Sequence, residues 1–195
     1  MSKNIFLEFD LVQAEWVVVA YLSKDPNMIK VVEDGLDAHA QTGHLITGVP
    51  LSLIYEEDDL LGHSTDEAEI AMGREKLPDL LAVATFLPRV MTIRQMGKKS
   101  DHGLNYRQTW VGFSDTYEIP VPEAKRIITG YTKQAYRDIP VWWDSIEREL
   151  RDSRRILYNC HPFRRKRYFM DQWGGHMIRE AIAFKPQSTV ADITK

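Results

Sequence analysis

Four side chains spaced four residues apart form the clearest chemical pattern in this chain. They are two cations followed by two planar rings: Arg94, Lys98, His102 and Tyr106. The segment contains no proline and can form one helix, on which a four-residue step rotates the side chain by only ~40°. Such a stripe extends over ~18 Å, which is long enough for the cations to bind a triphosphate while the rings contact a sugar and a base.

A carboxylate near the N-terminus helps to interpret this stripe. A solvated basic helix whose rings face the core would show the same four-residue spacing. However, residues 4–11 are a short, mostly apolar run that predicts a strand ending at Asp10. A strand-end aspartate suits Mg²⁺, which prefers oxygen ligands and keeps coordination sites for substrate phosphates. The carboxylate and the cationic helix together indicate nucleotidyl transfer.

Four short motifs, in order along the chain, resemble those of family A DNA polymerases, which include bacterial DNA polymerase I and many phage replicases. Residues 10–15, Asp-Leu-Val-Gln-Ala-Glu, resemble the first palm motif, D-Y-S-Q-x-E. Residues 37–39, Asp-Ala-His, resemble D-x-H. Residues 94–106 resemble the fingers motif R-x3-K-x3-F-x3-Y-G, and residues 187–193, Gln-Ser-Thr-Val-Ala-Asp-Ile, resemble Q-G-T-A-A-D-I.

The resemblance implies a mechanism in which two Mg²⁺ ions clamp the attacking and leaving oxygens of nucleotidyl transfer. Asp10 would bind both ions, and the carbonyl oxygen of Leu11 would complete one coordination shell. Arg94 and Lys98 would hold the β- and γ-phosphates. Lys98 would also protonate the departing pyrophosphate, because a lysine proton can be released. Asp10 and Lys98 are therefore the expected catalytic residues.

The resemblance also assigns residues to the deoxynucleotide and to DNA. Glu15 would lie under the sugar and crowd a 2′-hydroxyl, and Tyr106 would stack near the templating base. Further nucleotide contacts are expected from Gln13, His39 and His102. Contacts with primer-template DNA are expected from Arg107, Arg179 and Gln187. A partly buried histidine with a structural partner is an equally good interpretation of His39.

Three positions depart from the family pattern. His102 stands where Phe or Tyr is usual, and imidazole adds hydrogen bonding and a charge that changes near neutral pH. The usual discrimination at the 3′ position of the sugar therefore does not carry over. Arg107 replaces the glycine that normally follows the tyrosine, and Ala183 replaces a common asparagine that contacts template or primer.

The second catalytic carboxylate of the family lies in a later His-Asp-Glu hairpin, and the sequence ends at Lys195 before such a segment. Asp192 is the late acidic candidate, but it fits the helix after Gln187. We therefore expect fingers and part of a palm, from an incomplete sequence or a divided gene, inactive alone. The expected partners are deoxynucleoside triphosphates, primer-template DNA and the remaining thumb and C-terminal palm segments.

The expected fold class is α+β and mainly helical, with fingers helices inserted into an incomplete antiparallel palm sheet. Residues 1–16 and 166–195 are expected to be palm, and residues 17–165 fingers. Pro88 predicts a long helix over residues 89–106. Residues 49–74 predict a loop containing a short helix. Separate final helices are predicted up to Ala183 and from Thr189.

Composition limits the alternatives without choosing a function. The chain has 195 residues, of which 44% are hydrophobic, and a single cysteine, Cys160, which excludes an internal disulfide framework. No apolar run approaches the ~20 residues that span a bilayer, so we expect the cytoplasm of a bacterium or an infected cell. The net charge is −3, but basic residues gather over residues 148–167 and could form a face for nucleic acid.

Three other functions share parts of this sequence pattern. A single-subunit RNA polymerase shares the basic helix and the aspartate strand, but Glu15 and residues 37–39 look like the DNA enzymes. A non-catalytic nucleic-acid-binding module stays open because the second carboxylate is missing. A P-loop hydrolase fails because Thr92 and Lys99 stand where Gly and Ser or Thr belong. Within the polymerases, residues 94–99 favour a phage-type replicase.

Overall fold

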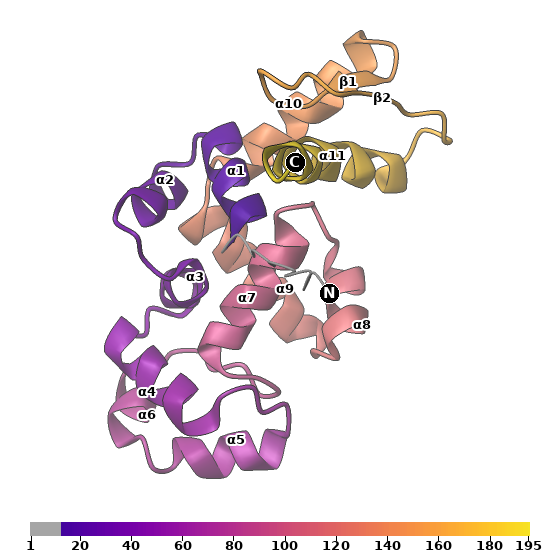
Figure 1. Cartoon of the computed structure of the whole chain (residues 1–195). Coiled ribbons are helices and arrows are strands. Elements are labelled where there is room, and N and C mark those ends of the chain that lie inside the picture. Colours follow the sequence, from indigo (N-terminus) through magenta and orange to yellow (C-terminus); the bar gives the residue numbers. More distant parts are fainter. Residues whose placement is uncertain (1–12) are drawn as a thin grey trace, which may run out of the picture.

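The computed structural model describes residues 13–195, which form helices and one small hairpin (Figure 1). The elements in chain order are α1 (Ala14–Ser23), α2 (Pro26–Glu33), α3 (Ala38–Thr47), α4 (Leu51–Leu61), α5 (Glu67–Arg74), α6 (Pro78–Val83), α7 (Ile93–Leu104), α8 (Trp110–Tyr117), α9 (Val121–Gly130), the π-helix η1 (Tyr131–Ala135), α10 (Ile139–Asp152), β1 (Ile156–Tyr158), β2 (Lys166–Tyr168) and α11 (Gly175–Ile193). The predicted mainly helical α+β class is confirmed. The predicted strand at residues 4–11 lies outside the described residues.

Helix α7 crosses the middle of the molecule, with α4–α6 at one end and α10, the hairpin and α11 at the other (Figure 1). Its largest contact within the described part of the chain is with α3. The two helices approach closely because glycines meet at their crossing: a Cβ at Gly97 would overlap the carbonyl oxygen of His39 and lie 3.0 Å from the nitrogen of Gly43. The crossing therefore fixes α3 against α7.

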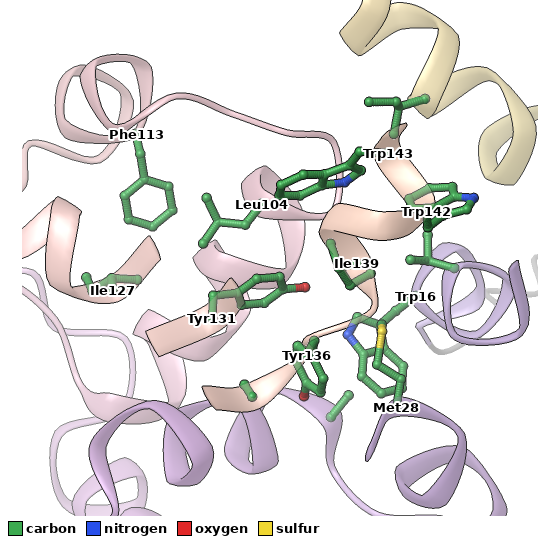
Figure 2. Close-up of a cluster of buried hydrophobic side chains, with 14 of the residues drawn as sticks. Trp16, Met28, Leu104, Phe113, Ile127, Tyr131, Tyr136, Ile139, Trp142 and Trp143 are labelled. Carbon is green, nitrogen blue, oxygen red and sulfur yellow. The ribbon is translucent and has the colours of Figure 1, made fainter. Parts of the chain in front are cut away.

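Large aromatic side chains of the core hold the C-terminal end of α7. Figure 2 shows Tyr131, Tyr136 and Trp143 in one buried cluster with Leu104. The hydroxyl of Tyr131 donates to Asn105 Oδ1 at 2.7 Å, and the indole of Trp143 donates to the Asn105 carbonyl at 2.8 Å. Because both bonds are buried, they fix the turn that follows α7.

The hairpin and α11 form a second packed region beside α1 and α10. Strands β1 and β2 are antiparallel, with Leu157 opposite Arg167. Asp192 near the end of α11 accepts a hydrogen bond from Asn159 Nδ2 at 2.8 Å and pairs with Arg165, which lowers the pKa of Asp192 to about 2. The Asp192 carboxylate therefore connects α11 to the hairpin. Asp192 also lies in a helix, as predicted.

The predicted helix over residues 89–106 is too long at both ends. Helix α7 begins at Ile93, and Thr92 caps it by accepting a hydrogen bond from the Gln95 N–H. The carbonyls of Pro88 and Met91 instead accept hydrogen bonds from Arg74. A buried partner from α5 therefore holds the segment before α7 in a non-helical conformation, and residues 105–107 form a turn.

Two further predictions of local structure are wrong. Residues 49–74 contain two helices, α4 and α5, where a loop with one short helix was predicted. Helix α11 is continuous from Gly175 to Ile193, although Pro186 lies inside it. Proline removes one backbone hydrogen bond, but Pro186 is buried with Ile182 and Phe184, and this packing outweighs the loss. None of the helices in residues 13–195 combines the length and apolar character needed to cross a bilayer.

Candidate functional site

A cavity of about 620 Å³ lies between the start of α1, the N-terminal part of α3, one face of α7 and the end of α11. This volume is in the range of small-molecule sites. Seven predicted site residues line it: Gln13, Glu15, His39, Arg94, Lys98, His102 and Tyr106. The structure thus brings together residues from all four sequence motifs, because Val190 of the last motif lines the same cavity.

The two cations at this cavity differ in their partners. Arg94 Nε donates to Asp37 Oδ2 at 2.9 Å, and Arg94 Nη1 lies 3.6 Å from Asp58 Oδ2. Lys98 is exposed and has no ion pair within residues 13–195. The charge of Arg94 is therefore largely compensated by these two carboxylates, whereas that of Lys98 is not compensated within the described residues.

Asp37 both caps α3 and holds Arg94. Its carboxylate caps α3 by accepting hydrogen bonds from the N–H groups of His39 and Ala40, at 2.9 and 3.0 Å. Burial alone would raise the pKa of Asp37, but the Ala40 N–H and Arg94 together lower it. Asp37 therefore stays ionised and fixes the Arg94 guanidinium at the cavity edge.

Glu15 and Tyr106 meet at the other side of the cavity. The Tyr106 hydroxyl donates to Glu15 Oε2 in a short hydrogen bond. Burial and the Glu15 carboxylate raise the pKa of Tyr106, while the Gln187 side chain acts in the opposite direction. Tyr106 is therefore a neutral donor that holds Glu15 in place, and Gln187 of α11 lies beside the same hydroxyl.

His39 has a buried partner that sequence reasoning missed. Its Nδ1 lies 2.8 Å from Oδ2 of Asp101, whose side chain is 3% exposed. Asp101 lies three residues after Lys98 and thus on the same helix face, which was the available signal. Asn105 and Trp16 also line the cavity without having been predicted. This contact supports the interpretation of His39 as a partly buried histidine with a structural partner. His39 nevertheless also lines the cavity.

The candidate DNA contacts outside the cavity differ in their surroundings. Arg107 is paired with Glu147 at 2.8 Å and lies 3.8 Å from Asp144 on α10. Its φ of 60° is in the left-handed region that favours glycine, which explains why glycine suits this position. Arg179 lies in the first part of α11 and does not line the cavity.

The predicted magnesium ligands, Asp10 and Leu11, lie outside the described residues, so their geometry stays a prediction. The first described residues, Gln13 to Trp16, line the cavity. Another cluster that could hold a metal ion within residues 13–195 comprises Asp171, His176 and Glu180. It lies roughly 15 Å along α11 from the cavity residue Val190, and Glu180 is paired with Arg167 at 2.9 Å.

Comparisons with known proteins agree with the motifs. The chain is 28% identical to the thermostable DNA polymerase I of Thermus aquaticus over 197 residues, covering 98% of this chain and 19% of that protein. It is also 28% identical to the thermostable DNA polymerase I of Thermus thermophilus over 192 residues, covering 95% of this chain and 18% of that protein. The chain thus spans about a fifth of the length of these relatives.

A solved structure shares the fold. It is the POL domain of Pol1 from M. smegmatis in complex with DNA primer-template and dNTP, with a TM-score of 0.67 and 19% identity, covering 95% of this chain and 27% of that one. No family model matches the chain. The shared fold and the similarity along nearly the whole chain support the resemblance to part of a family A DNA polymerase.

Proposed function

We propose that this chain is the nucleotide-binding part of a family A DNA polymerase, which adds deoxynucleoside triphosphates to a primer 3′ end as directed by a template. The observation that supports this best is the cavity with Lys98 and Arg94 at one side and the Glu15–Tyr106 pair at the other. The assignment of residues 17–165 to fingers and of both flanking segments to palm belongs to this proposal. So does a phage-type origin.

In this proposal each end of the cavity binds a different part of the nucleotide. Lys98 attracts the triphosphate as a compact ammonium charge, and Arg94, held by Asp37, offers its planar guanidinium to the same phosphates. The carboxylate of Glu15, fixed by Tyr106, lies against the sugar. Asp10 and the Leu11 carbonyl would hold Mg²⁺, which when bound supplies charge neutralisation on the phosphates; a second carboxylate would come from the remaining polymerase segments.

Substitution of Lys98 by alanine tests the phosphate end. We expect the full chain to bind a deoxynucleoside triphosphate in the presence of Mg²⁺ and the Lys98→Ala variant to bind it about tenfold more weakly, or ~1.4 kcal/mol. Titration calorimetry measures both affinities. Lys76→Ala is the matched control, because it removes the same charge from an exposed position outside the cavity. Equal losses in both variants would contradict a specific phosphate site.

Primer extension separates the polymerase from the two alternatives. The full chain is mixed with separately produced thumb and C-terminal palm segments of a family A polymerase that include the second carboxylate. The proposal expects Mg²⁺-dependent extension of a primed template with deoxynucleotides. Nucleotide binding without extension would favour a non-catalytic binding module, and extension with ribonucleotides alone would favour an RNA polymerase.

Glu15 provides a separate test at the sugar end. Alanine at this position removes the side chain expected to crowd a 2′-hydroxyl, so we expect the preference for dATP over ATP to fall by about tenfold, ~1.4 kcal/mol. Competition binding of the two nucleotides measures the ratio. Glu15→Gln keeps the side-chain volume and is expected to retain most of the preference. An unchanged ratio in Glu15→Ala would remove Glu15 from sugar selection.

A further inference from the structure

A buried chain of hydrogen bonds leads to the cavity wall at His39. His39 Nδ1 lies 2.8 Å from Asp101 Oδ2, Thr42 Oγ1 donates to Asp101 Oδ1 at 2.9 Å, and Thr42 Oγ1 lies 2.7 Å from the Tyr136 hydroxyl. Asp101, Thr42 and Tyr136 are all buried. These hydrogen bonds join α3, α7 and Tyr136, the residue that follows η1. Of the four residues, His39 and Asp101 line the cavity, and Thr42 and Tyr136 do not.

The directions of these bonds follow from donor counting. Because the Thr42 hydroxyl gives its proton to Asp101, it must accept one from Tyr136. Tyr136 remains a neutral donor, since burial and the nearby Asp101 raise its pKa well above the usual value. Burial raises the pKa of Asp101, while His39 and Thr42 oppose that effect. An ionised Asp101 accepts hydrogens only, so the proton on His39 Nδ1 points toward it.

The other polar atom of the His39 ring, Nε2, has no hydrogen-bond partner within residues 13–195. In a neutral imidazole only one nitrogen has a proton, and Asp101 holds that proton at Nδ1. Nε2 is then an acceptor, which repels a phosphate oxygen. A second proton at Nε2 turns the ring into a cation that donates to phosphate, with Asp101 as its counter-charge.

We propose that the His39–Asp101 pair couples binding of the triphosphate to uptake of one proton, with Asp101 as the positioning residue that sets the His39 tautomer. This inference rests on the proposed nucleotide-binding function of the cavity. The proton comes from solvent on binding, resides on Nε2 while the phosphate is bound, and returns to solvent on release. No covalent bond changes.

Other charged groups at the cavity do not offer the same coupling. Those that line the cavity with His39, hold its helix or belong to its hydrogen-bond chain are Glu15, Asp37, Arg94, Lys98, Asp101, His102, Tyr106 and Tyr136. Two further groups on the same two helices, His44 on α3 and Lys99 on α7, do not line the cavity, and His44 Nδ1 lies 2.7 Å from the Val49 carbonyl oxygen. Arg94 and Lys98 are cations throughout the neutral range, and the two tyrosines are neutral there. His102 is the other histidine that lines the cavity, but it is exposed and has no carboxylate partner within residues 13–195.

The test is the pH dependence of nucleotide affinity of the full chain, measured by calorimetry from about pH 5.5 to about pH 8.5, where histidine titrates. Uptake of a proton on binding makes affinity highest at low pH, and we expect it to fall by up to tenfold per pH unit on the alkaline side. Calorimetry in buffers of different ionisation enthalpy counts the protons taken up. The ligand also titrates in this range, so the comparison between variants decides.

Asp101→Asn is expected to flatten this profile. The asparagine amide can donate to Nδ1, which moves the neutral proton to Nε2 and allows phosphate binding without proton uptake. His161→Ala is the matched control, because it removes an exposed histidine outside the cavity, and it is expected to keep the wild-type slope. His39→Gln supplies a neutral donor at the same place and is also expected to flatten the profile, which keeps the test valid if Asp101→Asn folds poorly.

The outcomes separate this inference from the proposed function. Wild-type slopes in Asp101→Asn and His39→Gln, with binding intact, would overturn the proton coupling and leave the nucleotide site standing. A nucleotide affinity of the wild-type chain that does not change with pH would also overturn the proton coupling and leave the nucleotide site standing. Absence of triphosphate binding by the wild-type chain at every pH would overturn both.

Discussion

Replacement of Arg74 by alanine is expected to destabilise the folded chain by about 3–5 kcal/mol, the usual loss when one partner of a buried ion pair is removed. Arg74 Nε donates to Glu57 Oε1 at 2.6 Å, and both side chains are buried. The same guanidinium donates to the carbonyls of Pro88 and Met91. Without it, an ionised carboxylate and two carbonyls would lose their partners at once.

This ion pair also positions the candidate site. Ile93 is the first residue of α7, and its N–H donates a hydrogen bond to Glu57 Oε2 at 2.7 Å. Burial raises the pKa of Glu57, against the opposing effects of Arg74 and the Ile93 N–H. Since Arg94 follows directly, we expect Arg74→Ala to weaken nucleotide binding as well as folding.

Urea denaturation at neutral pH measures the free energy of unfolding of Arg74→Ala and of a matched control, Lys30→Ala. Lys30 also forms an ion pair, with Asp34 at 2.6 Å, but the two side chains are 71% and 45% exposed. Exposed pairs contribute ~0–1 kcal/mol, so the control is expected to lose little. Similar small losses in both variants would show that the Arg74–Glu57 pair does not stabilise the fold.

Elements with local signals could be predicted from the sequence. Asp25-Pro26 and Asp37 precede α2 and α3, and both aspartates cap their helices, a role that aspartate commonly has at this position. The cationic stripe on α7 could be placed for the same reason, because its spacing is a property of one helix. Its residues do line one cavity with Glu15.

Features that depend on distant partners could not be predicted in this way. The acidic run at residues 56–59 looks like a solvated loop, but Glu57 is buried because Arg74 lies 17 residues away in sequence and beside it in space. Thr92 caps α7 in place of the expected start at Pro88 for the same reason. The His39–Asp101 pair joins residues 62 apart in sequence. Helix spacing places Asp101 on the face of Lys98, but it does not indicate that Asp101 pairs with His39.

Replacement of Gly97 by alanine is expected to cost about 3 kcal/mol, the upper part of the usual range for overpacking. The added methyl would overlap the backbone carbonyl of His39, and the nitrogen of Gly43 lies 3.0 Å away. Backbone atoms of a packed helix cannot rotate aside, so α3 and α7 must separate. The loss of stability from this overlap exceeds the gain from the higher helix propensity of alanine, which alone would stabilise the helix by ~1 kcal/mol.

Gly112→Ala is the matched control for this substitution. Gly112 also lies inside a helix, α8, but the nearest atom to its added Cβ is Thr109 Oγ1 at 3.4 Å, an ordinary contact. We expect this variant to be as stable as the wild type or slightly more stable in urea denaturation. If Gly97→Ala behaves like Gly112→Ala, the α3–α7 crossing is less tight than the structure indicates.

The same variant links the helix crossing to the chemistry of the cavity. His39 is on α3 and Asp101 is on α7, so a shift of one helix away from the other lengthens the 2.8 Å contact between them. Lys98 and Arg94 both lie on α7 and keep their mutual spacing. Under conditions where Gly97→Ala remains folded, we therefore expect it to retain triphosphate binding but to lose the steep pH dependence, as Asp101→Asn does. A steep profile in a folded but destabilised Gly97→Ala would mean that the pair survives the separation of its helices.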